Sequence, residues 1–292
     1  MKYSFISEHK KTWPIDVMCC LLNVKRTNYY SFQQRKLDKQ PALDHEDMLY
    51  WIKRIAESSH YSYGSRRMRK ALNALGYPVG RDKSKTLMKE ADVQVRYRKK
   101  YKVTTNSNHK QPLYENVLNR QFTVAKPNKA YVSDITYIGT QEGWLYLAVV
   151  IDVFSRKIVG WSMSSRMKAA LVCDALTMAL WQRKPAPGLI VHSDRGSQYA
   201  SHSYRNLLKK HRCVGSMSRK GNCWDNAVAE SLFGSLKQER VQWRHYQTRY
   251  EAQQDILNYI AMFYNSQRLH SFLGYVSPNK FEMEKRIVKK AA

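Results

Sequence analysis

The first part of the chain has the pattern of apolar and polar positions that short helices show. An apolar cluster in residues 15–22 is followed by the tripeptide Leu22–Val24 and then by the basic stretch "KRTNYYSFQQRK" in residues 25–36. This order predicts a helix, a tight turn and a basic helix, a layout that DNA-reading modules use and that helical bundles also show. We assign residues 1–40 to an N-terminal helical segment.

Three further helices are predicted in residues 41–95. Apolar stripes at helical spacing run through Met48, Ile52 and Ile55, and through Met68, Leu72 and Leu75. Asp44 can cap the first of these helices, Ser65 can cap the second, and Gly76 can end the second. The third is expected in residues 80–93. Because most charges on the other faces are positive, we predict a helix-turn-helix DNA-binding domain; a merely solvated surface is the alternative.

From about residue 130 the pattern becomes that of β-strands. "YVSDITYIGT" is rich in β-branched residues, and "GWLYLAVVIDVFSRKIVGWSM" predicts two strands joined at residues 154–157. A helix over about 168–183 and the short buried strand "GLIVHSD" follow. A short helix, a strand at 213–217 and two long helices, about 224–243 and 250–265, complete the pattern. Three strands in sequence, then alternating helix and strand, predict a mixed α/β sheet.

The charge of the chain indicates a polyanionic partner. Lys and Arg number 50 against 23 Asp and Glu, for a formal net charge of +27 and an isoelectric point near 9.9. Both halves carry the surplus, with +14 in residues 1–125 and +13 in residues 126–292. Because a polyanion relieves such self-repulsion, we predict nucleic acid as the partner; a ribosomal or membrane-surface protein is the alternative. Residues 96–125, including "RYRKKYK", are assigned to a basic linker.

The cysteines and the hydropathy of the chain exclude several classes of protein. None of the five cysteines forms a CxxC pair, which argues against a disulfide framework and against a compact zinc site. No apolar leader precedes Pro14, and the longest apolar run, residues 144–151, is too short to cross a bilayer. We therefore expect a protein of a reducing, cytosolic compartment.

Three acidic residues stand where a folded sheet would let their side chains converge. Asp134 lies inside the first strand, Asp194 ends "GLIVHSD" at the edge where α/β sheets bind ligands, and Glu230 lies on the first long helix. Three carboxylates held together form a hard-oxygen site that suits Mg²⁺ or Mn²⁺. Each acid could instead be a turn former or a solvated residue. Asp152 is given such a structural role at a turn, and Asp225 is expected to cap the helix of Glu230.

Spacing and neighbouring residues distinguish the three acids from the other carboxylates. Asp134 and Asp194 are separated by 59 residues, and Asp194 and Glu230 by 35. This spacing resembles the D,D(35)E signature of retroviral integrases and DDE transposases. The surrounding words "VSDITYI", "HSDRGSQY", "GNCWDNAVAESLFGSLKQE" and "YNSQRLHSFLGYVSPNKFE" resemble OrfB, the second reading frame of a large bacterial insertion-sequence family. "YGSRRMRKALNALG" resembles its helix-turn-helix region, so the resemblance covers nearly the whole chain.

The resemblance implies an α/β fold with an RNase H-like catalytic core, a five-stranded mixed sheet with helices on both faces. Residues 126–292 are assigned to this core and its C-terminal helices, behind the all-α helix-turn-helix region. Asp134, Asp194 and Glu230 would be the catalytic residues and the ligands of two Mg²⁺ ions, which Mn²⁺ could replace. Such ions clamp the attacking and leaving oxygens at phosphorus. Water would first free a transposon 3′-OH, and that 3′-OH would then join a second strand. No zinc is implied.

A second set of residues is predicted to contact DNA. Lys237 lies two helical turns after Glu230 on the same face, and Arg195 directly follows Asp194. The other predicted contacts are Arg66, Arg67, Arg98, Lys99 and Lys100. Gly234, between Glu230 and Lys237, is expected to let DNA or another helix approach closely. Three further residues could either contact DNA or pack in the core: His192, Arg268 and His270.

The resemblance also implies partners. The substrate would be double-stranded DNA, both terminal inverted repeats and target, and a homo-multimer is expected because two DNA ends must meet. In this family OrfB is usually fused to OrfA by ribosomal frameshifting, and this chain, starting at Met1, resembles OrfB alone. A cytoplasmic, nucleoid-associated bacterial protein without a membrane segment is expected. Two alternatives stay open, a metal-dependent nuclease of the same fold that cuts without joining and a DNA-binding protein with an inert core.

Overall fold

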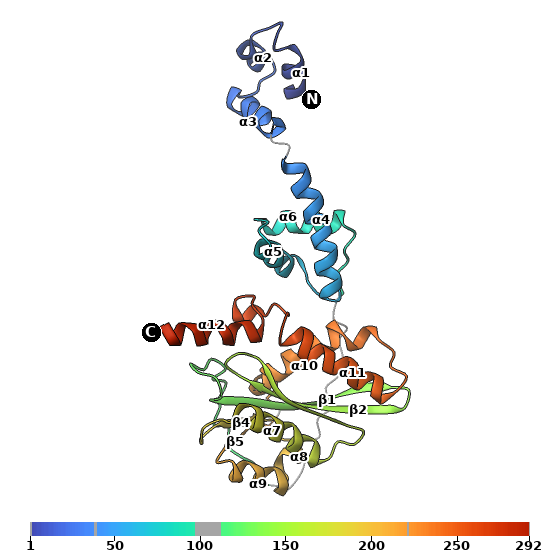
Figure 1. Cartoon of the computed structure of the whole chain (residues 1–292), viewed down its shortest axis with the longest axis vertical. Helices are drawn as coiled ribbons and strands as arrows, with labels where there is room; N and C mark the ends of the chain where they lie inside the picture. Colours follow the sequence, from blue (N-terminus) through green and yellow to red (C-terminus); the bar gives the residue numbers. More distant parts are fainter. Residues whose placement is uncertain (1, 38–39, 97–111, 221, 292) are drawn as a thin grey trace.

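The molecule is elongated, with three groups of elements arranged along its length. The computed structural model describes residues 2–37, 40–96, 112–220 and 222–291. Figure 1 shows the N-terminal helices at one end, a second helical group in the middle, and a sheet with its helices at the other end. Within the described residues, no helix is both long and apolar enough to cross a membrane.

The N-terminal helices form a small unit with an apolar centre of its own. They are α1 (Lys2–His9), α2 (Ile15–Leu21) and α3 (Arg26–Leu37). Met18 and Cys19 of α2 are buried together with Ile6 and Tyr29. The predicted helix, turn and basic helix are confirmed by α2 and α3. Helix α1 was not predicted, because Ile6 is its only buried residue and one residue makes no apolar stripe.

The middle group packs three helices around a second apolar cluster. They are α4 (Gln40–Ser58), α5 (Ser65–Ala74) and α6 (Arg81–Glu90). Met48 and Ile52 of α4 are buried against Met68 and Leu72 of α5, as the apolar stripes predict. Gly76 has a φ of +94° and follows the end of α5, so the predicted helix stop is confirmed.

Two predicted helix caps in this group are wrong. Helix α4 begins at Gln40, four residues before Asp44, which therefore lies inside the helix. Pro41 stands in the first turn, where proline is tolerated because its missing N–H has no helical partner there anyway. Ser65 is the first residue of α5, and Gly64 takes the N-cap position without a side-chain cap.

The core is built on one mixed sheet of five strands. They are β1 (Ala130–Thr140), β2 (Gly143–Asp152), β3 (Ile158–Ser164), β4 (Ile190–Ser193) and β5 (Val214–Met217). The strand order is β3-β2-β1-β4-β5, with β1 to β3 antiparallel and β1, β4 and β5 mutually parallel. This is the RNase H-like sheet that the sequence predicts.

Each face of the sheet is covered by its own helices. Helices α10 (Ala227–Glu239) and α11 (Arg249–Asn258) lie over one face, and α7 (Ala169–Arg183), α8 (Ser197–Ala200) and α9 (His202–Lys210) lie over the other. Side chains alternate along β1, so Val132 is buried under α10 while Tyr131 is buried under α7. Figure 1 shows α10 and α11 between the sheet and the middle helical group.

The two predicted long helices are shorter and differently bounded. Helix α10 is preceded by a 3-10 turn, Cys223–Asn226, and α11 continues as a π-helix, Tyr259–Tyr264. Asn226, and not Asp225, is the N-cap residue of α10. The carboxylate of Asp225 is instead held by Arg219 and Arg120, which lie 2.8 Å from its Oδ1. Two charge-assisted bonds outweigh one helix cap.

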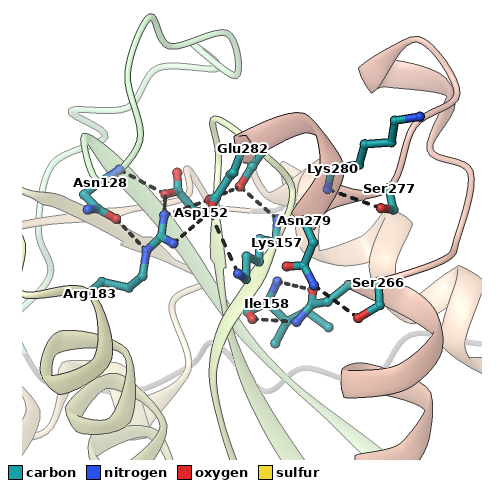
Figure 2. A network of polar contacts seen from close by, with 12 residues as sticks. Asn128, Asp152, Lys157, Ile158, Arg183, Ser266, Ser277, Asn279, Lys280 and Glu282 are labelled. Carbon is teal, nitrogen blue, oxygen red and sulfur yellow. Dashed lines mark hydrogen bonds and ion pairs between the residues drawn. The ribbon is translucent and has the colours of Figure 1, made fainter. Parts of the chain in front are cut away.

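Asp152 has the structural role that the sequence predicts for it. It ends β2, and its buried carboxylate accepts hydrogen bonds from the backbone N–H groups of Phe154 and Asn128. The guanidinium of Arg183 on α7 lies 3.1 Å from Asp152 Oδ2 (Figure 2). Asp152 thus ties the turn between β2 and β3 to the helix that covers it.

The C-terminal helix α12 (Pro278–Ala291) was not predicted and is fixed to the core by one buried carboxylate. Glu282 accepts hydrogen bonds from both terminal nitrogens of Arg183, at 2.9 and 2.7 Å, and from Ser155 Oγ at 2.7 Å. Lys157 Nζ lies 3.8 Å from the same carboxylate (Figure 2). One arginine of α7 therefore joins the β2–β3 turn to the C-terminal helix.

Candidate active site

The parallel pairing of β1 with β4 places two of the predicted acids side by side. The last residue pair of this ladder is Ser133 with Ser193, so Asp134 and Asp194 hold the next positions along the two neighbouring chains. Neighbouring strands lie about 5 Å apart. Asp134 is two residues after Val132 and therefore shares the face of β1 that α10 covers.

Glu230 approaches the same place from α10. It lies in the first turn of this helix, and the residue that precedes the helix, Asn226, donates a hydrogen bond from Nδ2 to Asp134 Oδ2 at 2.8 Å. Burial raises the pKa of Asp134 well above its ordinary value, and the negative charges of Asp194 and Glu230 raise it further. The fold therefore brings together three acids that have 59 and 35 residues between them in sequence.

Backbone N–H groups hold the two aspartates in place. Asp134 Oδ1 accepts from the N–H of Ile135 at 2.7 Å, and Asp194 Oδ1 accepts from the N–H of Gly196 at 2.9 Å. A Cβ atom on Gly196 would lie 3.1 Å from Asp194 Oδ1 and 3.0 Å from an oxygen of Gln198. A larger residue at this turn after β4 would therefore crowd the carboxylate, and Asp194 or Gln198 would have to shift by a few tenths of an ångström.

The donors of this cluster suit a hard divalent cation. They are the carboxylates of Asp134, Asp194 and Glu230, and the buried Oδ1 of Asn226, which has no hydrogen-bond partner among the described residues. Oxygen ligands of this kind are those that Mg²⁺ and Mn²⁺ take in proteins, and a cation would offset the like charge. In the described part of the chain, no three His, Cys, Asp or Glu side chains lie close enough to form a metal-binding group. Of the three acids, Glu230 is the one whose residue is exposed to solvent.

His192, Arg268 and His270, which the sequence assigns either to DNA contact or to core packing, pack against other parts of the protein. The ring of His192 lies between Ser216 Oγ, at 2.8 Å, and Ser218 Oγ, at 3.2 Å, and burial lowers its pKa to about 4. Arg268 is buried in a bidentate pair with Glu239. Burial, with the nearby charge of Arg268, lowers the pKa of His270 to about 3. These contacts account for His192 and Arg268 as core residues, whereas His270 is half-buried.

The predicted DNA contacts fall into different surroundings. Arg66 is exposed on α5, whereas the neighbouring Arg67 is largely buried, 3.6 Å from Glu239 and stacked over the ring of Tyr63. Glu239, which also pairs with Arg268, thus compensates part of the charge of Arg67 within the protein. Arg98, Lys99 and Lys100 lie outside the described residues.

The two predicted DNA contacts beside the acids are partly anchored. Arg195 donates from Nε to the backbone carbonyl of Ser218 at 2.6 Å, which directs its side chain along the turn after β5. Lys237 Nζ lies 4.6 Å from the centre of the Tyr137 ring, on the helix of Glu230. Gly234 is buried within α10, on the side of the helix that packs in the protein.

Sequence reasoning did not identify Asn226 as a residue of this cluster. It precedes Glu230 by four residues, so the two lie on one helical face, and that spacing was available in "WDNAVAE". An asparagine in a turn is ordinary, however, and only the bond to Asp134 sets it apart.

Comparison with known families gives three matches along the chain. Residues 124–223 match an integrase core domain, residues 230–285 match a second integrase core domain model, and residues 42–101 match an HTH-like domain. The first two matches together contain Asp134, Asp194 and Glu230. The third contains all of α5 and α6.

Whole-length relatives are also found. The chain is 41% identical over 285 residues to the transposase InsF for insertion sequence IS3A of Escherichia coli, covering 97% of this chain and 98% of the relative. It is 43% identical over 264 residues to an uncharacterized 31 kDa protein of insertion element IS600 of Shigella sonnei, covering 90% and 97%. Among solved structures, the catalytic core of BIV integrase matches with a TM-score of 0.41 and 16% identity over 56% of this chain and 99% of that one.

Proposed function

The chain belongs to the family of IS3-type insertion-sequence transposases, and on this premise we propose that Asp134, Asp194 and Glu230 are its catalytic residues. The protein is a DDE transposase with an integrase-type core, so its substrate is DNA. One observation supports the assignment of the three acids above all. The register of β1 and β4 sets Asp134 beside Asp194, and the charges of Asp194 and Glu230 both act on the half-buried Asp134.

Two divalent cations, Mg²⁺ with Mn²⁺ as a substitute, are the cofactors we propose. Asp134, Asp194 and Glu230 would hold them, and a nearby oxygen is Oδ1 of Asn226, which has no hydrogen-bond partner in the described part of the chain. When bound, such ions supply Lewis acidity and offset the negative charge that develops at phosphorus. The raised pKa of Asp134 is consistent with this role, because a cation would relieve the same repulsion.

The chain's own residues prepare the site for phosphoryl transfer. Asn226 orients Asp134 through Oδ2, and the N–H of Gly196 orients Asp194. Arg195 and Lys237, beside the acids, would bind the phosphates of the DNA end. Two steps are catalysed at this site: water cleaves one phosphodiester and leaves a 3′-OH, and that 3′-OH displaces the 3′-oxygen of a second phosphodiester.

The remaining partners follow from the same reaction. Arg66 on the exposed face of α5 would bind DNA phosphates, as would Arg98, Lys99 and Lys100 of the linker. Joining two element ends to one target requires at least two copies of the site, so we propose a homo-multimer on DNA. We also propose that the chain acts together with an OrfA protein, as a fusion, in the bacterial cytoplasm.

The test is strand joining by an element-end duplex that already carries a free 3′-OH. Purified protein, alone and fused to OrfA, is incubated with the labelled duplex in Mg²⁺ or EDTA. We expect metal-dependent joined products that Asp194→Asn reduces by about a hundred- to a thousandfold, the scale on which loss of a key charge-stabilising group acts. Asp174→Asn, an exposed aspartate on α7, is the matched control and should join at the wild-type rate.

Each other result contradicts a different part of the proposal. Cutting without joining would show a nuclease of the same fold. Tight DNA binding with neither reaction, even by the fusion, would show an inert core. Full activity of Asp194→Asn would remove Asp194 from the catalytic set.

A further inference from the structure

The largest aromatic side chain near the three acids is held out in solvent. Trp224 is 71% exposed, although a solvated indole gives up about 2–3 kcal/mol that its burial would contribute. It stands in the 3-10 turn Cys223–Asn226 that leads into α10. Asn226, which donates a hydrogen bond to Asp134, follows two residues later. Because consecutive Cα atoms are about 3.8 Å apart, the Cα atoms of Trp224 and Asn226 lie within about 7.6 Å of each other.

The backbone on both sides of Trp224 is fixed. Its N–H donates to Asn222 Oδ1 at 3.2 Å, and the next residue, Asp225, is fully buried. Asp225 Oδ2 accepts from the N–H and Nε of Arg219, both at 2.9 Å, and from Asn116 Nδ2 at 2.9 Å. Arg120 Nε bonds the other oxygen at 2.8 Å. Such a frame fixes the point of the backbone from which the exposed ring projects, so little backbone entropy is left to lose on binding.

The frame that holds Trp224 is also cationic. The side chains of Arg219 and Arg120 are 49% and 44% exposed, although each bonds Asp225. One carboxylate faces two guanidinium groups, so this turn keeps a net positive charge towards solvent. A flat apolar ring within a positive surround is the combination that binds a nucleotide, whose base stacks while its phosphate is neutralised.

We propose that Trp224 stacks on an unpaired base of the DNA end and thereby positions the adjacent phosphodiester at the three acids. This inference rests on the proposed function, since it needs DNA at that cluster. The stacked base offsets the few kcal/mol that opening a terminal base pair costs. Trp224 is thus a positioning residue, and its contribution is sequence-tolerant because every base offers a π-face.

The test combines a structural probe of the base with the joining assay. An element-end duplex carries 2-aminopurine at the terminal position, and stacking on an indole quenches its fluorescence. We expect the full-length protein to quench, Trp224→Ala to lose the quenching and to join about ten- to a hundredfold more slowly, and Trp224→Phe to keep most of both. Trp181→Ala removes an equally exposed indole, 73% exposed, from α7 on the opposite face of the sheet, and should change neither.

Two further arms distinguish positioning from a purely structural role. An end duplex with a mismatched terminal pair is already open, so it should restore part of the joining rate of Trp224→Ala. Asp194→Asn should quench like the wild type while joining nothing. Wild-type quenching and joining by Trp224→Ala would overturn the inference, as would an equal loss on matched and mismatched ends accompanied by a lower melting temperature. Joining by Asp194→Asn would contradict the catalytic assignment and leave the quenching result to decide on Trp224.

Discussion

At the scale of single residues, His270 makes the stability of the core depend on pH. Its pKa is lowered to about 3 by burial and by the charges of Arg268, Arg156 and Arg67, and its Nδ1 is buried without a partner in the described residues. The unfolded chain therefore binds a proton first as pH falls below about 6.5. Stability is present above this pH and is lost as pH falls towards the folded pKa.

The variant that tests this pH dependence is His270→Phe, which keeps a ring against Tyr264 and cannot be protonated. Between pH 7 and pH 5, the wild type should lose roughly 2 kcal/mol of unfolding free energy through His270 alone, and the variant should lack this share. Urea unfolding at both pH values measures the difference. The same replacement at the exposed His245 should leave the pH dependence unaltered. Equal losses in wild type and His270→Phe would show that the imidazole does not resist protonation in the fold.

At the scale of elements, the attachment of α12 depends on Glu282. Replacing Glu282 by Gln removes the charge that pairs with Arg183, while Asp152 still partly compensates the arginine. We expect a loss of about 1–3 kcal/mol, the range for a hydrogen bond to a charged group. Hydrogen exchange should quicken across residues 278–291 before it does in β1. Glu284→Gln, an exposed residue of the same helix, is the control, and comparable exchange in both variants would refute the attachment.

The same element scale shows what the sequence could and could not predict. Alternation with β-branched residues located β1, short apolar runs located the more deeply buried β2 and β4, and apolar stretches of helical length located α7 and α10, because each pattern is a local signal. The spacing and the family resemblance predict the three acids. The register of β1 with β4 explains why Asp134 and Asp194 lie side by side. The ion pairs of Asp225 with Arg120 and of Glu282 with Arg183 span 105 and 99 residues. Such pairs have no local pattern, so the sequence predicts Asp225 as a cap and does not predict α12.

At the scale of the whole molecule, the middle helices are joined to the core by polar contacts at the end of α10. Arg67 lies beside Glu239, which also holds Arg268, and Tyr63 Oη accepts from the N–H of Leu269 at 2.7 Å. His60 contacts Arg240, the residue after α10. The helix that begins beside the acids thus ends at the HTH-like helices. Two adjacent arginines of α5 have different surroundings.

These surroundings predict opposite consequences for Arg66 and Arg67. Arg66→Ala should weaken DNA binding several-fold and lower the slope of log K against log salt by about 1, because an exposed arginine releases one counterion on meeting a phosphate. Arg67→Ala should keep the slope and reduce the unfolding free energy by roughly 1–3 kcal/mol, because it leaves Glu239 with one cation fewer. Salt titrations of DNA binding and calorimetry of both variants separate the two effects. A reduced slope for Arg67→Ala would mean that this guanidinium leaves Glu239 for a phosphate, so that the middle helices and the core change their contact when DNA binds.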